Sequence, residues 1–424
     1  MTKKQILTLL VLFIGVSEVH GGMLSDNRYF PFQSYPVGRT LYQRSVADIG
    51  AFFTIANGAR GDEAIESIGI PELMGIYDQK QISDALLLIG KTTPLLAEWQ
   101  LQKTIPWQMY GKIAGQGFYF RSEIGFDNGL SLGFLTSAMH VSSVQRFTLP
   151  AVTIRDMNLQ PSQIVELDSE RRAMNDLLGL TGAQWSQSGT TDTMMYGRYG
   201  LLKEYVVKCR KVDAGVFGGF IWPTGILQDT NNPASVPFGS NGHSMVFFGA
   251  DGAFEVKEDW EFGLTMQLYE AFSKTQVIRM PVNYEPLPFG ALVGPAKIDP
   301  GSTFFFSTWF SMADLREGFG ASLQYTATVH GGDVYTDKRS DQTIPTTLNY
   351  AVNPNNPAWI DTYRRSQWVA EYICINAFYD PNWEKRDEKT APVFNFKWNI
   401  PVKILGAEKV SKTNFITVGL EYHF

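Results

Sequence analysis

The sequence predicts an all-β protein, a transmembrane antiparallel β-barrel of about twelve strands, and three observations support this. The stretch 413–424 alternates apolar and polar residues with the period of two that places successive side chains on opposite faces of a sheet. The composition is 13% aromatic and only 18% charged, with 39 glycines, which fits aromatic girdles and many turns. Beyond the N-terminus no apolar run reaches about 18 residues, so a membrane-spanning form requires a closed barrel. The alternative for 413–424 is a half-buried edge strand of a soluble sandwich.

The first 22 residues predict a Sec signal peptide. Lys3 and Lys4 form its basic region, residues 6–16 are apolar, and small residues near Gly21 and Gly22 offer a cleavage site. Segment 1–22 is therefore excluded from the fold, and the mature chain is expected in the bacterial outer membrane. Residues 23–44, rich in proline and aromatic residues, are interpreted as an N-terminal arm or plug segment, and 45–424 as the barrel.

The predicted strands are joined alternately by short turns and long connections. Asn128-Gly129 illustrates the turns, because this dipeptide suits the positive φ angles of a tight hairpin. An even strand number returns both ends of the barrel to the periplasmic side, with short turns there and long loops outside. The strands are expected at 45–56, 110–126, 130–144, 192–207, 212–222, 243–256, 260–270, 303–312, 318–329, 366–379, 390–404 and 413–424.

Three connections are long. Helical spacing within 76–89 and 161–180 places short helices in the connections 57–106 and 145–189. The third, 331–364, is polar and rich in proline and asparagine, which predicts a loop. Shorter turns are expected at 313–317 and 380–389.

The clearest strands have one apolar and one polar face. In 394–404, Phe394, Phe396 and Trp398 alternate with Asn395 and Lys397. A lysine or arginine that faces lipid at mid-depth costs about 2–4 kcal/mol, so the polar faces are expected to form the lumen wall. The candidate lining residues are Arg121, Glu123, Asp251, Glu261, Gln267, Glu371 and Lys397.

The apolar end of the last strand, Leu420, Tyr422 and Phe424, is interpreted as the insertion signal read by the barrel-assembly machinery. Outer-membrane lipid and a small-molecule solute are the other expected partners. The net charge of -6 gives no electrostatic footprint for nucleic acid. A monomer or a homotrimer is expected, without a cofactor or a metal.

The centre of the chain resembles the outer-membrane channels that include long-chain fatty-acid and toluene transporters, in the branch of the phenol-degradation meta-pathway proteins. The residues that carry the resemblance are Tyr196-Gly197-Arg198-Tyr199, the run 212–225 (VDAGVFGGFIWPTG) and the run 258–263 (EDWEFG). The resemblance covers less than a fifth of the chain, and the hatch motif of the fatty-acid transporters is not found at the N-terminus. It implies a closed barrel, with or without an N-terminal hatch, that admits small and often hydrophobic molecules by diffusion.

Enzymatic chemistry has weak support. His243 and Ser244 are adjacent, so on a strand they would point to opposite faces and could not form a nucleophile–base pair. His140 with a serine of a neighbouring strand stays open, although a histidine near a strand end is the simpler interpretation. Residues 215–219 follow no phosphate-loop pattern. Cys209 and Cys374 are expected as two unpaired thiols, and no catalytic residue is assigned.

Acidic residues allow three interpretations. Asp251, Glu255 and Glu261 would line an acidic constriction, hold a cation together with loop carboxylates, or be ordinary solvated charges of the lumen. Three function classes therefore stay open: a passive channel, an adhesin or surface scaffold, and a barrel enzyme. The channel is preferred. The loops 57–106, 145–189 and 331–364 would fold inward in a channel and outward in an adhesin.

Overall fold

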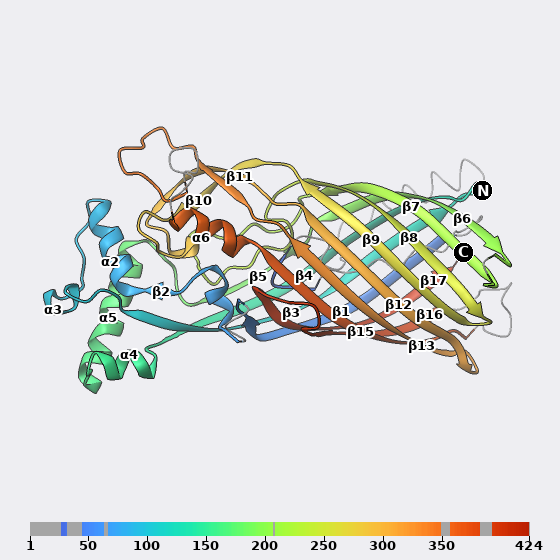
Figure 1. The fold of residues 1–424 in the computed structure, drawn as a ribbon, viewed down its shortest axis with the longest axis horizontal. Coiled ribbons are helices and arrows are strands. Elements are labelled where there is room, and N and C mark those ends of the chain that lie inside the picture. The colour runs from blue at the N-terminus through green and yellow to red at the C-terminus, as the bar shows by residue number, and fades with distance from the viewer. Residues whose placement is uncertain are drawn as a thin grey trace.

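The computed structural model describes residues 27–31, 45–62, 67–206, 208–348, 357–381 and 392–423. Twelve antiparallel strand positions close into one barrel, which confirms the predicted fold class. The strands run along the length of the molecule in Figure 1. In chain order the barrel strands are β1 (Ser45–Arg60), β3 (Pro106–Gly125), β4 (Leu130–Thr148), β5 (Gln184–Thr190) continued by β6 (Thr193–Glu204), β7 (Lys211–Trp222), β8 (Met245–Lys257), β9 (Trp260–Ala271), β12 (Thr303–Arg316), β13 (Phe319–His330), β15 (Trp368–Tyr379), β16 (Val393–Pro401) and β17 (Val410–His423).

The first and last strands close the barrel. β1 pairs with β17 on one side and with β3 on the other, so no edge is left there. Val46 lies opposite His423, which places both ends of the barrel at the end with the short turns, as predicted from the even strand count. Each strand thereby satisfies its backbone groups within the sheet, the requirement for crossing a lipid core.

One barrel position is built from two strands. β5 pairs with the outer part of β4 (Ala138 to Val144), and β6 pairs with the inner part (Leu130 to Leu135). The chain leaves the ladder between them at Thr191 and Asp192, both fully buried. β5 was not predicted, because its polar residues contain none of the apolar alternation by which the other strands were found.

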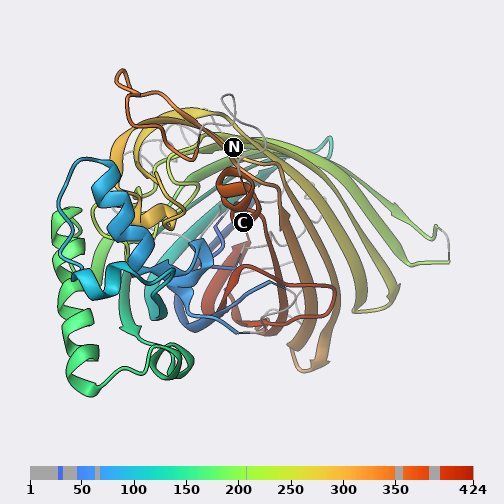
Figure 2. The ribbon, with the colours of Figure 1, turned by 60° about the vertical axis from the view of Figure 1, so that its left-hand side comes forward.

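The segments 77–105 and 149–183 form a helical layer beyond the outer end of the barrel (Figures 1 and 2). A buried cluster that includes Leu86, Trp99, Trp107, Leu167 and Phe289 holds this layer together. The predicted helices within 76–89 and 161–180 are confirmed. The layer contains β2 (Tyr77–Asp78), α2 (Gln79–Leu88), α3 (Ala97–Gln100), α4 (Ala151–Asp156) and α5 (Pro161–Leu177). η1 (Ile70–Met74) precedes it, and its Ile70 and Leu73 pack inside the barrel.

A second sheet was missed in the sequence. β10 (Lys274–Met280), β11 (Leu292–Asp299) and β14 (Val334–Asp337) form a separate three-stranded sheet, with η2 (Leu287–Phe289) between the first two strands. α6 (Pro357–Ser366) follows in the connection to β15. The predicted turn at 313–317 is also wrong, because β12 continues to Arg316 before it reverses at Glu317 and Gly318.

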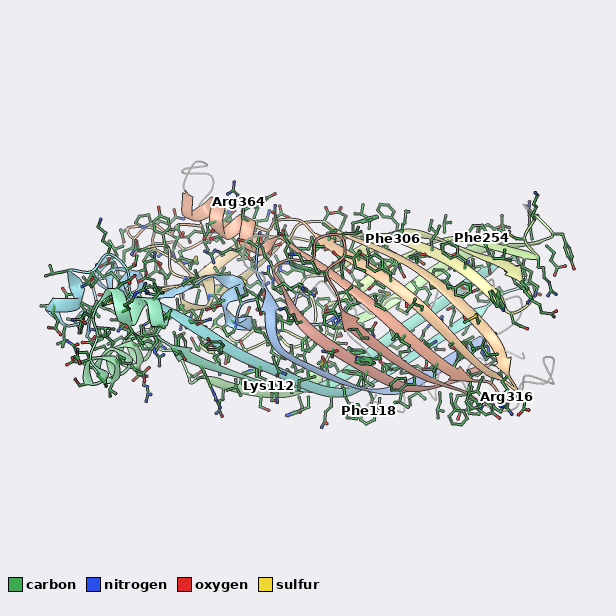
Figure 3. The ribbon with its side chains drawn as sticks, turned by 60° about the horizontal axis from the view of Figure 1, so that its bottom comes forward. Lys112, Phe118, Phe254, Phe306, Arg316 and Arg364 are labelled. Atoms are coloured by element: carbon green, nitrogen blue, oxygen red, sulfur yellow. The ribbon has the colours of Figure 1, made fainter. Side chains whose placement is uncertain are left out.

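Apolar side chains cover the outside of the barrel. Figure 3 shows Phe118, Phe254 and Phe306 on the outside of the barrel. Lys112 lies nearer than Phe118 to the end with the helical layer, and Arg316 lies at the opposite tip. The exposed fractions of Phe118 (55%) and Phe248 (58%) are those of side chains that require lipid. No helix in the described ranges is long and apolar enough to cross a membrane.

The outer parts of β3 and β4 extend beyond this apolar belt. β3 has 20 residues and β4 has 19, whereas about 9–11 residues are enough to cross a bilayer. Their outward side chains change from Phe118 and Leu132 to Gln116, His140 and Ser142 along the way. The belt thus ends part-way along the barrel, and the helical layer stands clear of the lipid.

Glu170 makes the helical layer sensitive to pH. Burial raises the pKa of the Glu170 carboxyl to about 7, while a hydrogen bond from the Leu96 amide lowers it. Because the folded-state pKa is above the usual value, the stabilisation is complete at acidic pH and is lost as pH rises through about 7. We expect this layer to be more stable at pH 5 than at pH 8 by about 2 kcal/mol, as hydrogen exchange of α5 would measure.

Glu170→Gln should remove that pH dependence, because the amide cannot ionise. Asp176→Asn on the exposed side of the same helix is the control and should retain it. An unchanged pH dependence in Glu170→Gln would assign the effect to another group.

Candidate functional site: the barrel lumen

The outer half of the lumen is filled by two segments that enter the barrel. Phe30 of 27–31 and Phe238 of 223–244 are 2% and 0% exposed and pack on inward side chains such as Phe52, Met139 and Phe415. We call 27–31 and 223–244 together the lumen insert. The sequence predicted 223–241 only as a polar loop, and of the predicted N-terminal arm 23–44 only residues 27–31 are described.

Asp192, at the break between β5 and β6, anchors the longer segment. Its carboxylate accepts hydrogen bonds from the Gly225 amide (3.0 Å), the Ser240 amide (2.7 Å) and the Ser240 hydroxyl (2.7 Å). Gly239 has a φ of 143°, and a Cβ there would meet the Asp192 carboxylate at 2.4 Å, so only glycine fits. Because the ladder is interrupted at Asp192, this one residue binds both ends of the inserted loop.

The N-terminal segment is bound by polar contacts on several sides. Asn27 Nδ2 donates to the carbonyl of Pro237 (2.9 Å), within the longer segment. Arg28 donates to the carbonyls of Arg365 and Ser366, both at 2.8 Å. Thr413 of β17 donates its hydroxyl to the Tyr29 carbonyl at 2.6 Å. The segment is thus fixed to the barrel wall, to α6 and to the other half of the insert.

A recess remains between the insert and the outer ends of β3 and β4. The recess is small, with a cavity volume of about 20 Å³, and it is partly open to solvent. Its lining is mostly apolar, with Tyr29, Ile70, Met74, Ile113 and Val236 among the contributing residues.

Below the insert the lumen is polar, and its first ionic cluster centres on Glu123. The Glu123 carboxylate accepts three hydrogen bonds, from Arg121 Nη2 at 2.6 Å, from the Tyr196 hydroxyl at 2.9 Å and from the Ser131 hydroxyl at 2.7 Å. Arg121 and Glu123 are 6% and 1% exposed. The pair was predicted as lumen-facing, and it lies on the side of β3 opposite Phe118 and Phe120.

The second cluster centres on Arg198. Its guanidinium donates to both carboxylate oxygens of Asp251, at 2.8 Å and 2.6 Å, and to Asp213 Oδ1 at 2.9 Å. All three side chains are at least 94% buried. One arginine between two aspartates leaves one negative charge, and the bidentate geometry is the strong form of such a pair. Arg198 and Asp213 were quoted for the family resemblance, but their role was not predicted.

Glycines in the wall make room for these large inward side chains. A Cβ at Gly133 would lie 2.0 Å from Tyr196 Cζ, and one at Gly215 would lie 2.6 Å from Arg198 Cζ. Gly50 and Gly419 make room for Tyr119 in the same way. The glycines of 212–225 that carry the resemblance are thus partly explained by packing inside the barrel.

The remaining predicted lining residues lie at several places. Gln267 is buried and accepts a hydrogen bond from the Tyr269 hydroxyl. Glu261 Oε1 lies 3.5 Å from the Trp309 indole nitrogen. Lys397 is partly exposed on the inward face of β16, on the same side as the buried Asn395.

Glu371 does not line the lumen, and its predicted position is wrong. It shares the outward face of β15 with Ile373 and Ile375, whereas Tyr372 and Cys374 face the lumen. Its carboxylate accepts hydrogen bonds from the amides of Ile404, Leu405 and Gly406, in the connection that folds over the outside of the barrel, and from the Tyr325 hydroxyl. A charged residue on the outward face is accommodated because backbone donors, not lipid, surround it.

The histidines have structural partners. His140 faces outward, and its Nδ1 and Nε2 lie 2.8 Å from Ser188 Oγ and 3.2 Å from Ser186 Oγ. Among the described residues no carboxylate orients this ring, so a triad is incomplete. His243 Nδ1 lies 2.9 Å from the Phe272 carbonyl, where it connects the inserted loop to the chain after β9. No disulfide joins Cys209 to Cys374.

The proposed insertion signal is only partly described. Leu420 and Tyr422 share the outward face of β17 with the exposed Val418. Phe424 lies outside the described residues, as does the predicted signal peptide of 1–22.

A closed barrel with an apolar belt outside and buried charge inside defines a transmembrane β-barrel of the outer-membrane type. Among solved structures, the chain is similar to the COG4313 outer membrane channel from Pseudomonas putida F1, with a TM-score of 0.50, 8% identity, and coverage of 93% of this chain and 100% of that one. A TodX mutant described as a monoaromatic hydrocarbon channel matches with a TM-score of 0.36 at 8% identity, covering 96% of this chain and 97% of that one. No protein-family model and no curated sequence matches the chain. At such identities the similarity shows the fold, and at that level it confirms the predicted resemblance to these channels.

Proposed function

We propose that this protein is an outer-membrane channel through which small molecules, hydrophobic ones included, diffuse passively. The observation that carries the proposal is the division of the lumen into an apolar outer half, built by the lumen insert, and a charged half below it. The fold similarity to outer-membrane channels supports the proposal.

The proposal places the chain in the outer membrane after Sec export, inserted by the barrel-assembly machinery and surrounded by lipid along the apolar belt. Residues 27–31 form part of a plug in the lumen, and the solute passes when the lumen insert moves aside. Of the predicted lining residues, Arg121, Glu123, Asp251, Glu261, Gln267 and Lys397 form the wall that the solute meets on the periplasmic side.

Swelling of liposomes that contain the refolded protein tests the proposal. We expect small uncharged solutes to enter faster than in liposomes with the heat-denatured chain, and larger solutes to be excluded because the insert narrows the lumen. A barrel that is folded, as shown by heat-modifiable migration on a gel, but leaves permeation at the lipid background would contradict it.

A surface role is the second candidate, and the helical layer favours it. The segments 77–105 and 149–183 fold outward, away from the lumen (Figure 2). Leu87, Leu88 and Leu101 are 50%, 56% and 87% exposed in this layer. A scaffold role would leave permeation unchanged when this layer is altered and would abolish surface binding.

A further inference from the structure

The lumen below the insert carries more negative than positive charge. Among the described side chains of the barrel strands, away from the turns, the inward-facing carboxylates outnumber the inward-facing permanent cations by five to three. The carboxylates are Asp48, Glu123, Asp213, Asp251 and Glu421, and the cations are Arg121, Arg198 and Lys397. A narrow lumen with low-dielectric walls concentrates the field of such an excess.

Two of the three cations are already engaged. Arg121 contacts Glu123 at 2.6 Å, and Arg198 is shared between Asp213 and Asp251. Lys397 has no carboxylate within 4.0 Å among the described residues. The excess charge is therefore not cancelled by contact pairs on the β3–β4–β6–β7–β8 side of the wall.

The remaining acids gather where β16, β17 and β1 meet. Asp48 lies directly opposite Glu421 across the β1–β17 pair, and like charges in that position repel each other. Asp48 accepts a hydrogen bond from the Tyr119 hydroxyl at 3.0 Å, and Glu421 contacts the His423 imidazole at 2.8 Å. Arg121 lies opposite Asp48 on its other side, across the β1–β3 pair, but its guanidinium contacts Glu123, and among the described residues no permanent positive charge contacts Asp48.

An oxygen without a donor faces the same place. Asn395 is 7% exposed, and its Oδ1 accepts no hydrogen bond from the described residues. The Tyr119 hydroxyl, Asn395 Oδ1 and Asp48 Oδ1 lie 2.5, 2.8 and 3.3 Å from the point that a Cβ at residue 419 would occupy. The absence of a side chain at Gly419 thus lets the Tyr119 hydroxyl, Asn395 Oδ1 and Asp48 Oδ1, from three different strands, come together in the wall.

From this arrangement we infer that the lumen passes cations in preference to anions, and that monovalent cations and small organic amines rest at Asp48, Asn395 and Glu421 above Gly419. Oxygen ligands suit such ions, and an amine can donate to each of them. The Lys397 ammonium competes with such cations for these oxygens, because it faces the lumen two residues from Asn395 on the same strand. This inference rests on the proposed channel function.

The test is the reversal potential of the refolded protein in a planar bilayer under a KCl gradient, for the native chain and for a chain with residues 229–240 excised. We expect K⁺ to be favoured over Cl⁻. Asp48→Asn should lower the permeability ratio about twofold and Lys397→Gln should raise it about twofold, the effect of one unit charge roughly 7 Å from the path in water. Asp299→Asn, at the exposed end of β11, is the matched control and should leave the ratio unchanged.

The outcomes separate the two proposals. Steady current with Cl⁻ favoured, or with a ratio that Asp48→Asn and Lys397→Gln do not move in opposite directions, would overturn the cation preference and leave the channel intact. The absence of current in both chains, although both are folded, would overturn the channel and the cation preference together. A competing effect of methylammonium on K⁺ current that is lost in Asp48→Asn would support the resting site.

Discussion

Arg198→Met is expected to destabilise the barrel by about 3–5 kcal/mol, the usual effect of removing one partner from a buried ion pair. The substitution removes the hydrogen bonds to Asp251 and Asp213 and leaves two carboxylates facing each other in the barrel wall. Both are 6% exposed, so water cannot replace the guanidinium without reorganising the lumen. Urea unfolding of the protein refolded into lipid vesicles, followed by tryptophan fluorescence, measures the effect.

The triple variant Arg198→Met with Asp213→Asn and Asp251→Asn is the informative companion. If the loss comes from uncompensated charge, neutralising both acids should recover most of the stability, because replacing a whole buried ion cluster is often close to neutral. A triple variant as unstable as Arg198→Met alone would instead attribute the loss to packing around Gly215. Arg172→Met on exposed α5 is the control and should change stability by less than about 0.5 kcal/mol.

Most of the barrel could be predicted from the sequence because lipid requires apolar side chains at every second position along the strands that cross it. Phe394, Phe396 and Trp398 alternate with polar residues since one face meets hydrocarbon, and that alternation is visible without a structure. Where the outside is water the rule disappears. β5, whose outward side chains Gln184, Ser186 and Ser188 are polar and lie above the belt, and the sheet of β10, β11 and β14 were therefore missed.

The lumen was predicted less completely, for a related reason. Inward residues were inferred from strand parity, which identified Arg121, Glu123 and Asp251 but gave no partners. Glu371 was misassigned because a charge was assumed to face inward, whereas here backbone amides of a neighbouring connection surround it on the outside. The inward positions of Arg198 and Asp213 could have been inferred from the alternation along their strands, since they share the inward faces with Tyr196 and Ile221.

The lumen insert had no sequence signal, because its position depends on contacts between distant parts of the chain. Asn27 contacts Pro237, and Asp192 contacts Ser240, across separations that a local pattern does not record. Its apolar members, such as Val236 and Phe238, are isolated within a polar loop and read as ordinary loop residues until the barrel surrounds them.

Excising residues 229–240 and joining Gln228 to Asn241 through two glycines should convert the protein from a closed or briefly opening barrel into one with stable open steps in a planar bilayer. The structure permits this excision, since the Gln228 amide donates to Asn241 Oδ1 at 2.9 Å and the two ends already meet. Removal of Val236 and Phe238 opens the apolar half of the lumen, and the loss of Pro237 and Gly239 releases Asn27. Single-channel recording at fixed voltage measures the change.

The control is an excision of similar kind outside the lumen. Arg339 Nη2 donates to the Ile344 carbonyl at 2.7 Å, so the exposed residues 340–343 beyond the barrel can be replaced by two glycines while the Arg339–Asp337 ion pair is kept. That chain should conduct as the native protein does, because its insert is intact. If both excisions opened the barrel equally, the current would reflect a general loosening of the outer end. If neither excision opened the barrel, the obstruction would lie below the insert, at the level of the Arg121 and Arg198 clusters. The insert would then be a structural element of the barrel mouth and not its gate.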